Sequence, residues 1–236
     1  MNPAGRHNSQ SLPRNPALLV AASGLRAALF PIPVITLFWK DEIGMSLADI
    51  MWLQAIFGAT AVVFEFPSGY VADRLGYRLS LLAGAFFWLA GWAAYALGTT
   101  FGGMVLAEML LGVGLAFISG ADSALLFVSL DARGDAAGYL RWEGRVRAAA
   151  QASEAASSAA GGWLYTIAPR LPLWMQLPVA AANLAAIAAM REAQPAGTGS
   201  RMTHLARAWH IVGHALVRHA RLRAAMTLSV ALGVST

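Results

Sequence analysis

The chain has 236 residues, of which 58% are hydrophobic and only 12% are charged. Ordinary soluble domains carry about twice that share of charged residues, so the composition excludes such a domain and indicates a membrane protein. The net charge of +5 does not indicate nucleic-acid binding, because the basic residues lie in short segments between apolar runs and not on one basic face. Without cysteine the chain has neither disulfide bonds nor thiolate metal sites.

Six apolar runs are each long enough to cross a bilayer core of about 30 Å as a helix. In chain order they cover residues 16–39, 47–70, 79–98, 103–128, 146–167 and 172–190. The first run follows Arg6 and Arg14 in the manner of a secretory signal. It is too long for a signal and has no clear cleavage site, so we expect it to remain as the first span. Pro31 and Pro33 predict a kink in this helix.

A basic segment and a seventh apolar run follow the sixth helix. Residues 191–221 are predicted to form a linker, with a basic amphipathic helix over 203–221 that is suited to a membrane surface. His210 and His214 have a spacing that metal ligands use, but no further ligand accompanies them. We therefore expect a solvated or interfacial face, no metal site and no cofactor. Residues 222–236 are too few for an upright span, so we expect an incomplete seventh helix and interpret the chain as a fragment.

Lys and Arg are distributed unevenly between the predicted loops. Of the 17 such residues, only Lys40 and Arg170 lie in loops on one side of the membrane, while Arg26 lies inside the first helix. All the others lie in the segments of the opposite side, which are residues 1–15, 71–78, 130–147 and 191–223. Because basic loops stay in the cytoplasm, we predict a cytoplasmic N-terminal tail and a cytoplasmic linker.

Polar residues inside the predicted spans form the candidate substrate cavity or ion pair. They are Arg26, Gln54, Glu108, Ser119, Asp122 and Glu154. A charged group in the hydrocarbon core costs at least about 2.5 kcal/mol, so each needs a partner or a watery cavity. Glu108, Ser119 and Asp122 would lie within about 60° of one another on an unbroken helix, which predicts one polar face.

Arg26 is expected to face the bundle interior, within reach of a carboxylate from the fourth or fifth helix. Two interpretations stay open at this point. In one, Arg26 forms a buried ion pair with Asp122 or Glu154 that only holds helices together. In the other, these residues take part in binding a substrate or moving a proton.

The loop "GYVADRLGYR" between the second and third helices concentrates charge and glycine. Gly69 would let two backbones approach closely, and Gly76 would permit a tight turn with positive φ. Asp73 can accept hydrogen bonds from free N–H groups at a nearby helix N-terminus, while Arg74 and Arg78 can pair with acidic groups or lipid phosphates. An ordinary basic cytoplasmic turn is the alternative interpretation, but such a turn needs neither the aspartate nor the two glycines.

This loop closely resembles the G-x-x-x-D-R-x-G-R-[RK] signature of the major facilitator superfamily, with Tyr77 in place of the first arginine of the final pair. The resemblance covers about residues 16–236 and implies one of two six-helix halves, built as a 3+3 inverted repeat. It implies that the loop is a conformational latch against the other half, and that the first and fourth helices line the central cavity. Glu108 stands where an arginine is usual, and Ser157 and Ser158 replace a Gly-Pro pair, so proton-driven antiport does not follow from the resemblance.

The sequence therefore predicts an all-α membrane protein with a six-helix transmembrane bundle over 16–190, one half of a major-facilitator-type fold, and a truncated seventh helix. The function it predicts is secondary-active transport of a small solute by alternating access, as part of a twelve-helix transporter. A non-transporting membrane scaffold or assembly factor is the alternative. With neither a phosphate loop nor a spaced nucleophile and base, we do not expect an enzyme.

The expected location is the inner membrane, crossed several times. The expected partners are membrane lipids, an unknown small-molecule substrate, and either a missing C-terminal half or a second copy, with no nucleic acid. Alone, the chain is expected to transport nothing, because alternating access needs two halves.

Overall fold

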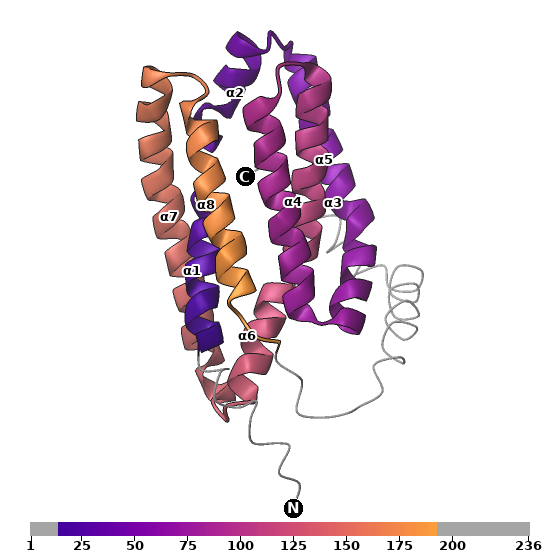
Figure 1. Cartoon of the computed structure of the whole chain (residues 1–236), viewed down its shortest axis with the longest axis vertical. Coiled ribbons are helices and arrows are strands. Elements are labelled where there is room, and N and C mark those ends of the chain that lie inside the picture. Colours follow the sequence, from indigo (N-terminus) through magenta and orange to yellow (C-terminus); the bar gives the residue numbers. More distant parts are fainter. Residues whose placement is uncertain (1–13, 193–236) are drawn as a thin grey trace, which may run out of the picture. The chain divides into compact units, whose positions relative to one another are not determined.

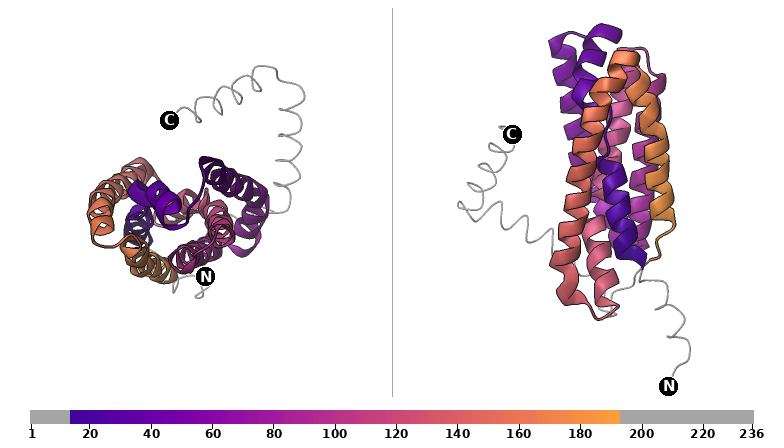
Figure 2. Two further views of the ribbon diagram at one scale, coloured as in Figure 1. Left: turned by 90° about the horizontal axis from the view of Figure 1, so that it is seen from above. Right: turned by 90° about the vertical axis from the view of Figure 1, so that its left-hand side faces the viewer.

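The computed structural model describes residues 14–192, which are helical apart from short connections and contain no strand. They belong to one compact unit. Its long helices run side by side as a bundle (Figures 1 and 2). The main helices are α1 (Asn15–Ala27), α3 (Leu47–Leu75), α4 (Tyr77–Leu97), α5 (Phe101–Ile118), α6 (Ala121–Asp131), α7 (Tyr139–Ile167) and α8 (Leu171–Ala188). The all-α fold is confirmed, while most of the predicted tail, the linker beyond residue 192 with its two histidines, and the seventh helix lie outside the described residues.

The first span is interrupted in its middle, as its prolines predict. After α1 the chain leaves the helix at Ala28 and resumes as three short turns, η3 (Ile32–Val34), α2 (Ile35–Leu37) and the π-helical η4 (Phe38–Glu42). The amides freed by the break still find acceptors inside the bundle. Leu29 N donates to Ser157 Oγ of α7 at 2.9 Å, and Phe30 N donates to Gln176 Oε1 of α8 at 3.1 Å. Neighbouring helices thus satisfy backbone groups that lipid cannot satisfy.

The fourth span is also interrupted, and here the prediction of one unbroken helix over 103–128 is wrong. α5 ends at Ile118, and α6 begins at Ala121. Gly120 between them has φ = 76°, a left-handed conformation that glycine adopts without steric cost. The fifth helix, predicted from residue 146, begins at Tyr139 and therefore includes the charged cytoplasmic segment, because those arginines and glutamates are themselves good helix formers.

Small residues bring α4 and α5 together. A Cβ added at Gly84 would lie 3.0 Å from the carbonyl oxygen of Gly114, and one at Gly91 would lie 2.7 Å from the side chain of Leu111. On the other side of α5, a Cβ at Gly112 would lie 2.8 Å from the carbonyl oxygen of Phe57 in α3. Close backbone approach through glycine is typical of helices packed in membranes, where the hydrophobic effect does not drive helices together.

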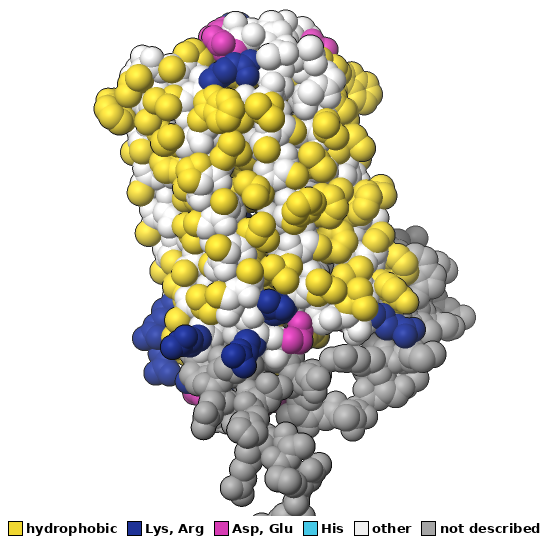
Figure 3. All heavy atoms as spheres, viewed as in Figure 1, with side chains coloured by type: hydrophobic (Ala, Val, Ile, Leu, Met, Phe, Trp, Pro, Cys, Tyr) yellow, Lys and Arg dark blue, Asp and Glu magenta, His cyan; other side chains and the backbone are white. Residues whose placement is uncertain are grey.

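The surface of the bundle is suited to lipid. Five helical stretches of the described chain are long and apolar enough to cross a membrane: Asn15–Glu42, Leu47–Leu75, Tyr77–Leu97, Phe101–Asp131 and Leu171–Ala188. α7, the fifth of the six predicted spans, is more polar than these, so its place among the bundle helices, and not its hydropathy, indicates that it is a span (Figure 1). Apolar side chains cover the middle of the face shown in Figure 3, and most of its Lys and Arg side chains gather at one end.

Candidate functional site

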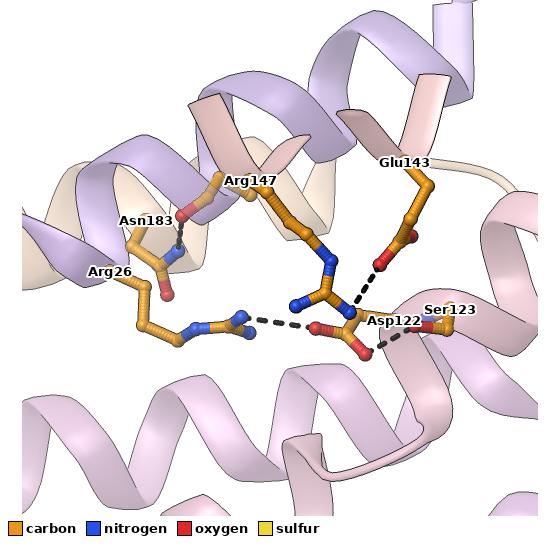
Figure 4. A network of polar contacts seen from close by, with 7 residues as sticks. Arg26, Asp122, Ser123, Glu143, Arg147 and Asn183 are labelled. Carbon is orange, nitrogen blue, oxygen red and sulfur yellow. Dashed lines mark hydrogen bonds and ion pairs between the residues drawn. The ribbon is translucent and has the colours of Figure 1, made fainter. Parts of the chain in front are cut away.

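An ion pair joins the two interrupted spans. Arg26 Nη2 donates to Asp122 Oδ2 at 3.0 Å, and the two side chains are 24% and 26% exposed (Figure 4). Arg26 lies in the last turn of α1, and Asp122 lies in the first turn of α6, so each charge also complements the dipole of its own helix. The prediction that Arg26 reaches a carboxylate is confirmed, and of the two candidate partners the carboxylate is that of Asp122 and not of Glu154.

A second ion pair lies beside the first. Arg147 Nη2 and Glu143 Oε1, both on α7, are 2.9 Å apart, and Figure 4 shows them next to Asp122. The cavity at this point has a volume of only about 30 Å³ and is lined by Arg26, Asp122 and Glu143 among others. A single water needs at least about 10–15 Å³, so the cavity has room for about two waters and for no solute. We call these residues the inner polar site.

A second polar site lies between α3, α4, α5 and the end of the first span. The Glu108 carboxylate is buried, with an exposed fraction of 6%, and accepts a hydrogen bond from the Tyr95 hydroxyl. The adjoining cavity has a volume of about 140 Å³. Its lining residues are Leu29, Ile32, Ile35, Trp39, Gln54, Phe57, Trp88, Trp92, Tyr95, Glu108 and Leu111. We call this the outer aromatic site.

The predicted polar face of the fourth span is therefore divided. Glu108 lines the outer aromatic site, Asp122 lines the inner polar site, and Ser119 is exposed at the interruption between α5 and α6. The turn at Gly120 ends the helical register on which the common face depended. Gln54 joins Glu108 at the outer aromatic site, and Glu154 is exposed on α7.

The loop between α3 and α4 is fastened to the end of α8. Gly76 has the predicted positive φ, 105°, and an added Cβ there would lie 2.6 Å from the Glu192 carboxylate. That carboxylate accepts hydrogen bonds from Tyr77 N at 3.1 Å and from Arg78 N at 3.0 Å. Arg78 Nη2 also donates to the carbonyl oxygen of Ala188 at 2.8 Å. The carboxylate at the N-terminus of α4 thus belongs to Glu192, where the sequence had suggested Asp73.

The other loop residues make fewer contacts within the described part of the chain. Gly69 is exposed, and a Cβ there would meet no atom within 4 Å, so the close backbone approach expected at this glycine is wrong for the contacts between residues 14 and 192. Asp73 is exposed, and Arg74 is stacked over the ring of Tyr70 at 5.5 Å. A latch role against a second half stays a prediction.

The family model of the Major Facilitator Superfamily matches residues 17–236. The chain belongs to this superfamily. It is also 34% identical over 95 residues to the inner membrane transport protein YajR of Escherichia coli (strain K12). That match covers 40% of this chain and 20% of the Escherichia coli protein. Membership of the major facilitator superfamily places the chain among multi-pass membrane transport proteins.

The sequence did not indicate that three residues would make the contacts described above. These residues are Tyr95, Gln176 and Glu192. Each makes a hydrogen bond to a partner that is distant in the sequence, with separations of 13, 146 and 115 residues respectively. A polar residue in an apolar helix was a signal for Gln176, but nothing in the sequence indicated its partner. Within residues 14–192 no cluster of three or more potential metal ligands occurs.

Proposed function

We propose that this protein carries out secondary-active transport of a small solute across the inner membrane by alternating access. Its superfamily supports transport, and the similar protein from Escherichia coli is described as an inner membrane transport protein. A second six-helix half, from a continued chain or a second copy, is the partner that completes the cycle, because alternating access requires two halves around a shared site.

The observation that carries the proposal is the ion pair between two broken helices. Interrupted helices at membrane depth are typical of transporters, where they allow parts of the bundle to move separately. Arg26 and Asp122 connect the two interruptions, so breaking their ion pair would change the contacts of both spans. In hydrocarbon such a pair separates only if water, a substrate or another charge replaces the lost partner.

The proposed orientation places the N-terminus in the cytoplasm. It is supported by the loops that connect the bundle helices, since Lys40 and Arg170 are the basic residues at one end of the described bundle. At the other end lie Arg14, Arg74, Arg78, Arg133, Arg141, Arg145, Arg147 and Arg191. Such an excess is what the positive-inside rule associates with the cytoplasmic side.

A labelling experiment tests the orientation. The chain contains no cysteine, so single cysteines at Lys40 and Arg133 report unambiguously. In intact cells a membrane-impermeant maleimide should label K40C and not R133C, and both should react after the membrane is permeabilised. Labelling of R133C alone in intact cells would reverse the proposed topology.

Transport itself is tested with purified protein in proteoliposomes under an imposed proton or sodium gradient. A defined mixture of amino acids, sugars and amines is offered, and uptake is read by mass spectrometry. We expect no saturable uptake by the 236-residue chain alone, and gradient-dependent, saturable uptake once a second six-helix half is supplied. In that complete form Asp122→Asn should lower uptake at least tenfold, while Glu65→Gln, an exposed carboxyl change on α3, should leave it within twofold. A complete form, with both halves, that folds, binds other membrane proteins and takes up no solute would support the scaffold alternative.

A further inference from the structure

Among residues 14–192, the outer aromatic site contains one charged side chain and no balancing cation. Glu108 is the only charged residue among those that line the cavity, and its hydrogen-bond partner, Tyr95, is neutral. A carboxylate that is buried in a membrane protein without a counter-ion is costly, and such groups generally mark ligand or ion pathways. The arrangement suits a ligand that supplies a positive charge.

Aromatic rings make up much of the wall around this carboxylate. The ring centroids of Trp92 and Tyr95 are 5.6 Å apart at an interplanar angle of 36°, and those of Trp88 and Trp92 are 6.2 Å apart at 80°. Trp92 is therefore edge-on to Trp88 and tilted against Tyr95, and all three rings line the same cavity. Tryptophan and tyrosine faces attract cations, and cages of such rings bind quaternary ammonium groups in water-excluded sites.

Unpaired indole groups give the second indication of a polar ligand. The Nε1–H groups of Trp88 and Trp92 are buried and have no acceptor among the described residues. A buried donor without a partner costs about 1–3 kcal/mol, so native structures rarely retain one without a reason. A ligand that carries an acceptor oxygen near its cationic group would pair with one of these donors.

The size of the cavity limits the ligand to a compact molecule. Its volume is about 140 Å³, close to that of an apolar cavity of about 150 Å³ that holds a benzene molecule. A single trimethylammonium group with a short hydroxyalkyl arm is of this size, whereas a multi-ring cation is not.

From the charge, the rings, the free donors and the volume, we propose that the outer aromatic site binds a small organic ammonium ion bearing a hydroxyl or carbonyl oxygen, of the amino-alcohol type. Glu108 acts as its counter-ion, the rings of Trp92 and Tyr95 contact its alkylammonium head, and an indole N–H donates to its oxygen. The inference names a substrate class for the transport function proposed above and rests on that function.

Choline and its uncharged isostere 3,3-dimethylbutan-1-ol form a matched pair of probes. They share shape and hydroxyl group and differ in charge. Binding to the purified protein in detergent is measured by equilibrium dialysis and by the fluorescence of the site's tryptophans. We expect choline to bind saturably and at least tenfold more tightly than the alcohol. Equal affinity for the two probes, or no saturable binding of choline up to millimolar concentration, would overturn the proposal.

Variants assign the binding to Glu108. Glu108→Gln should weaken choline binding at least tenfold and leave that of the alcohol within twofold, whereas the control Glu65→Gln should change neither. Unchanged choline affinity in Glu108→Gln would contradict the proposal. If Glu108→Gln fails to fold, the choline-to-alcohol ratio in the unsubstituted protein still decides the outcome.

The same probes separate this inference from the proposed function. Choline that binds with Glu108 dependence but never accumulates in proteoliposomes, even with the second six-helix half present, would uphold the site and contradict transport of this class of substrate. Saturable uptake of a different solute, by protein that does not bind choline, would uphold transport and overturn the site.

Discussion

The inner polar site and the outer aromatic site differ in how the charge of a carboxylate inside the bundle is balanced. At the inner site Arg26 and Asp122 neutralise each other, and the adjoining cavity is only about 30 Å³. At the outer site the partner of Glu108 within the described part of the chain is the neutral hydroxyl of Tyr95, and the cavity is about 140 Å³. A carboxylate that is paired with an arginine needs no charged ligand. A carboxylate without such a partner leaves a site in which a cationic ligand can supply the missing positive charge.

The largest effect on stability is expected from breaking the inner pair on one side. Arg26→Met would remove the guanidinium group that Asp122 contacts, and losing one partner of a buried pair costs about 3–5 kcal/mol. Because both side chains are about a quarter exposed, we expect the lower end, about 3 kcal/mol. Unfolding in mixed detergent micelles, followed by tryptophan fluorescence, measures this loss.

The double variant Arg26→Met, Asp122→Leu serves as the control for that prediction. Replacing a whole ion pair by apolar residues is often neutral, so most of the lost stability should return while transport stays impaired. If Arg26→Met alone is as stable as the unsubstituted protein, the inner ion pair does not contribute to the stability of the fold.

An intermediate effect is expected at the outer site from Tyr95→Phe. The change removes the hydroxyl donor and leaves the buried Glu108 carboxylate without its hydrogen bond, which costs about 1–3 kcal/mol. Tyr165→Phe on α7, a half-buried tyrosine outside both sites, should cost less than about 0.5 kcal/mol in the same unfolding measurement. Equal losses for the two variants would mean that the Tyr95–Glu108 hydrogen bond contributes nothing.

The smallest effect is expected from Glu108→Gln. The amide oxygen can still accept from Tyr95, and a neutral amide is easier to bury than a carboxylate, so the free energy of unfolding should change by no more than about 1 kcal/mol. This outcome would show that the negative charge of Glu108 is not needed for the stability of the fold. A loss as large as that of Arg26→Met would instead make Glu108 a structural residue and remove the contrast between the two sites.

The parts of this organisation that sequence predicts are those set by local chemistry. The cost of burying Arg26 in a membrane requires a nearby carboxylate, and Pro31 and Pro33 remove backbone donors from the first span. The positive φ of Gly76 follows from a glycine in a two-helix turn. Each of these inferences depends on a residue and its immediate neighbours, and the structure agrees with each.

The parts that sequence does not predict depend on the approach of distant helices. Gly112 and Gly114 continue a helix while Gly120 lies in the turn between two, and their different surroundings in the bundle, not their residue type, account for this. The carboxylate of Glu192 reaches the start of α4 only because α8 ends beside it. The division of Glu108 from Asp122 has the same origin, because the two-residue break between α5 and α6 changes the direction in which the side chains after it point.

The interruption of the first span has a consequence for the order in which the protein is made. Leu29 and Phe30 leave the ribosome 128 and 146 residues before Ser157 and Gln176, the side chains that accept their amide hydrogens. At about 5–20 residues per second, that interval is on the order of ten seconds. During it, the nascent first span has two amides that lipid cannot satisfy. The earliest segment to be synthesised is therefore among the last to reach its final conformation, and it needs water or the insertion machinery beside it until α7 and α8 arrive.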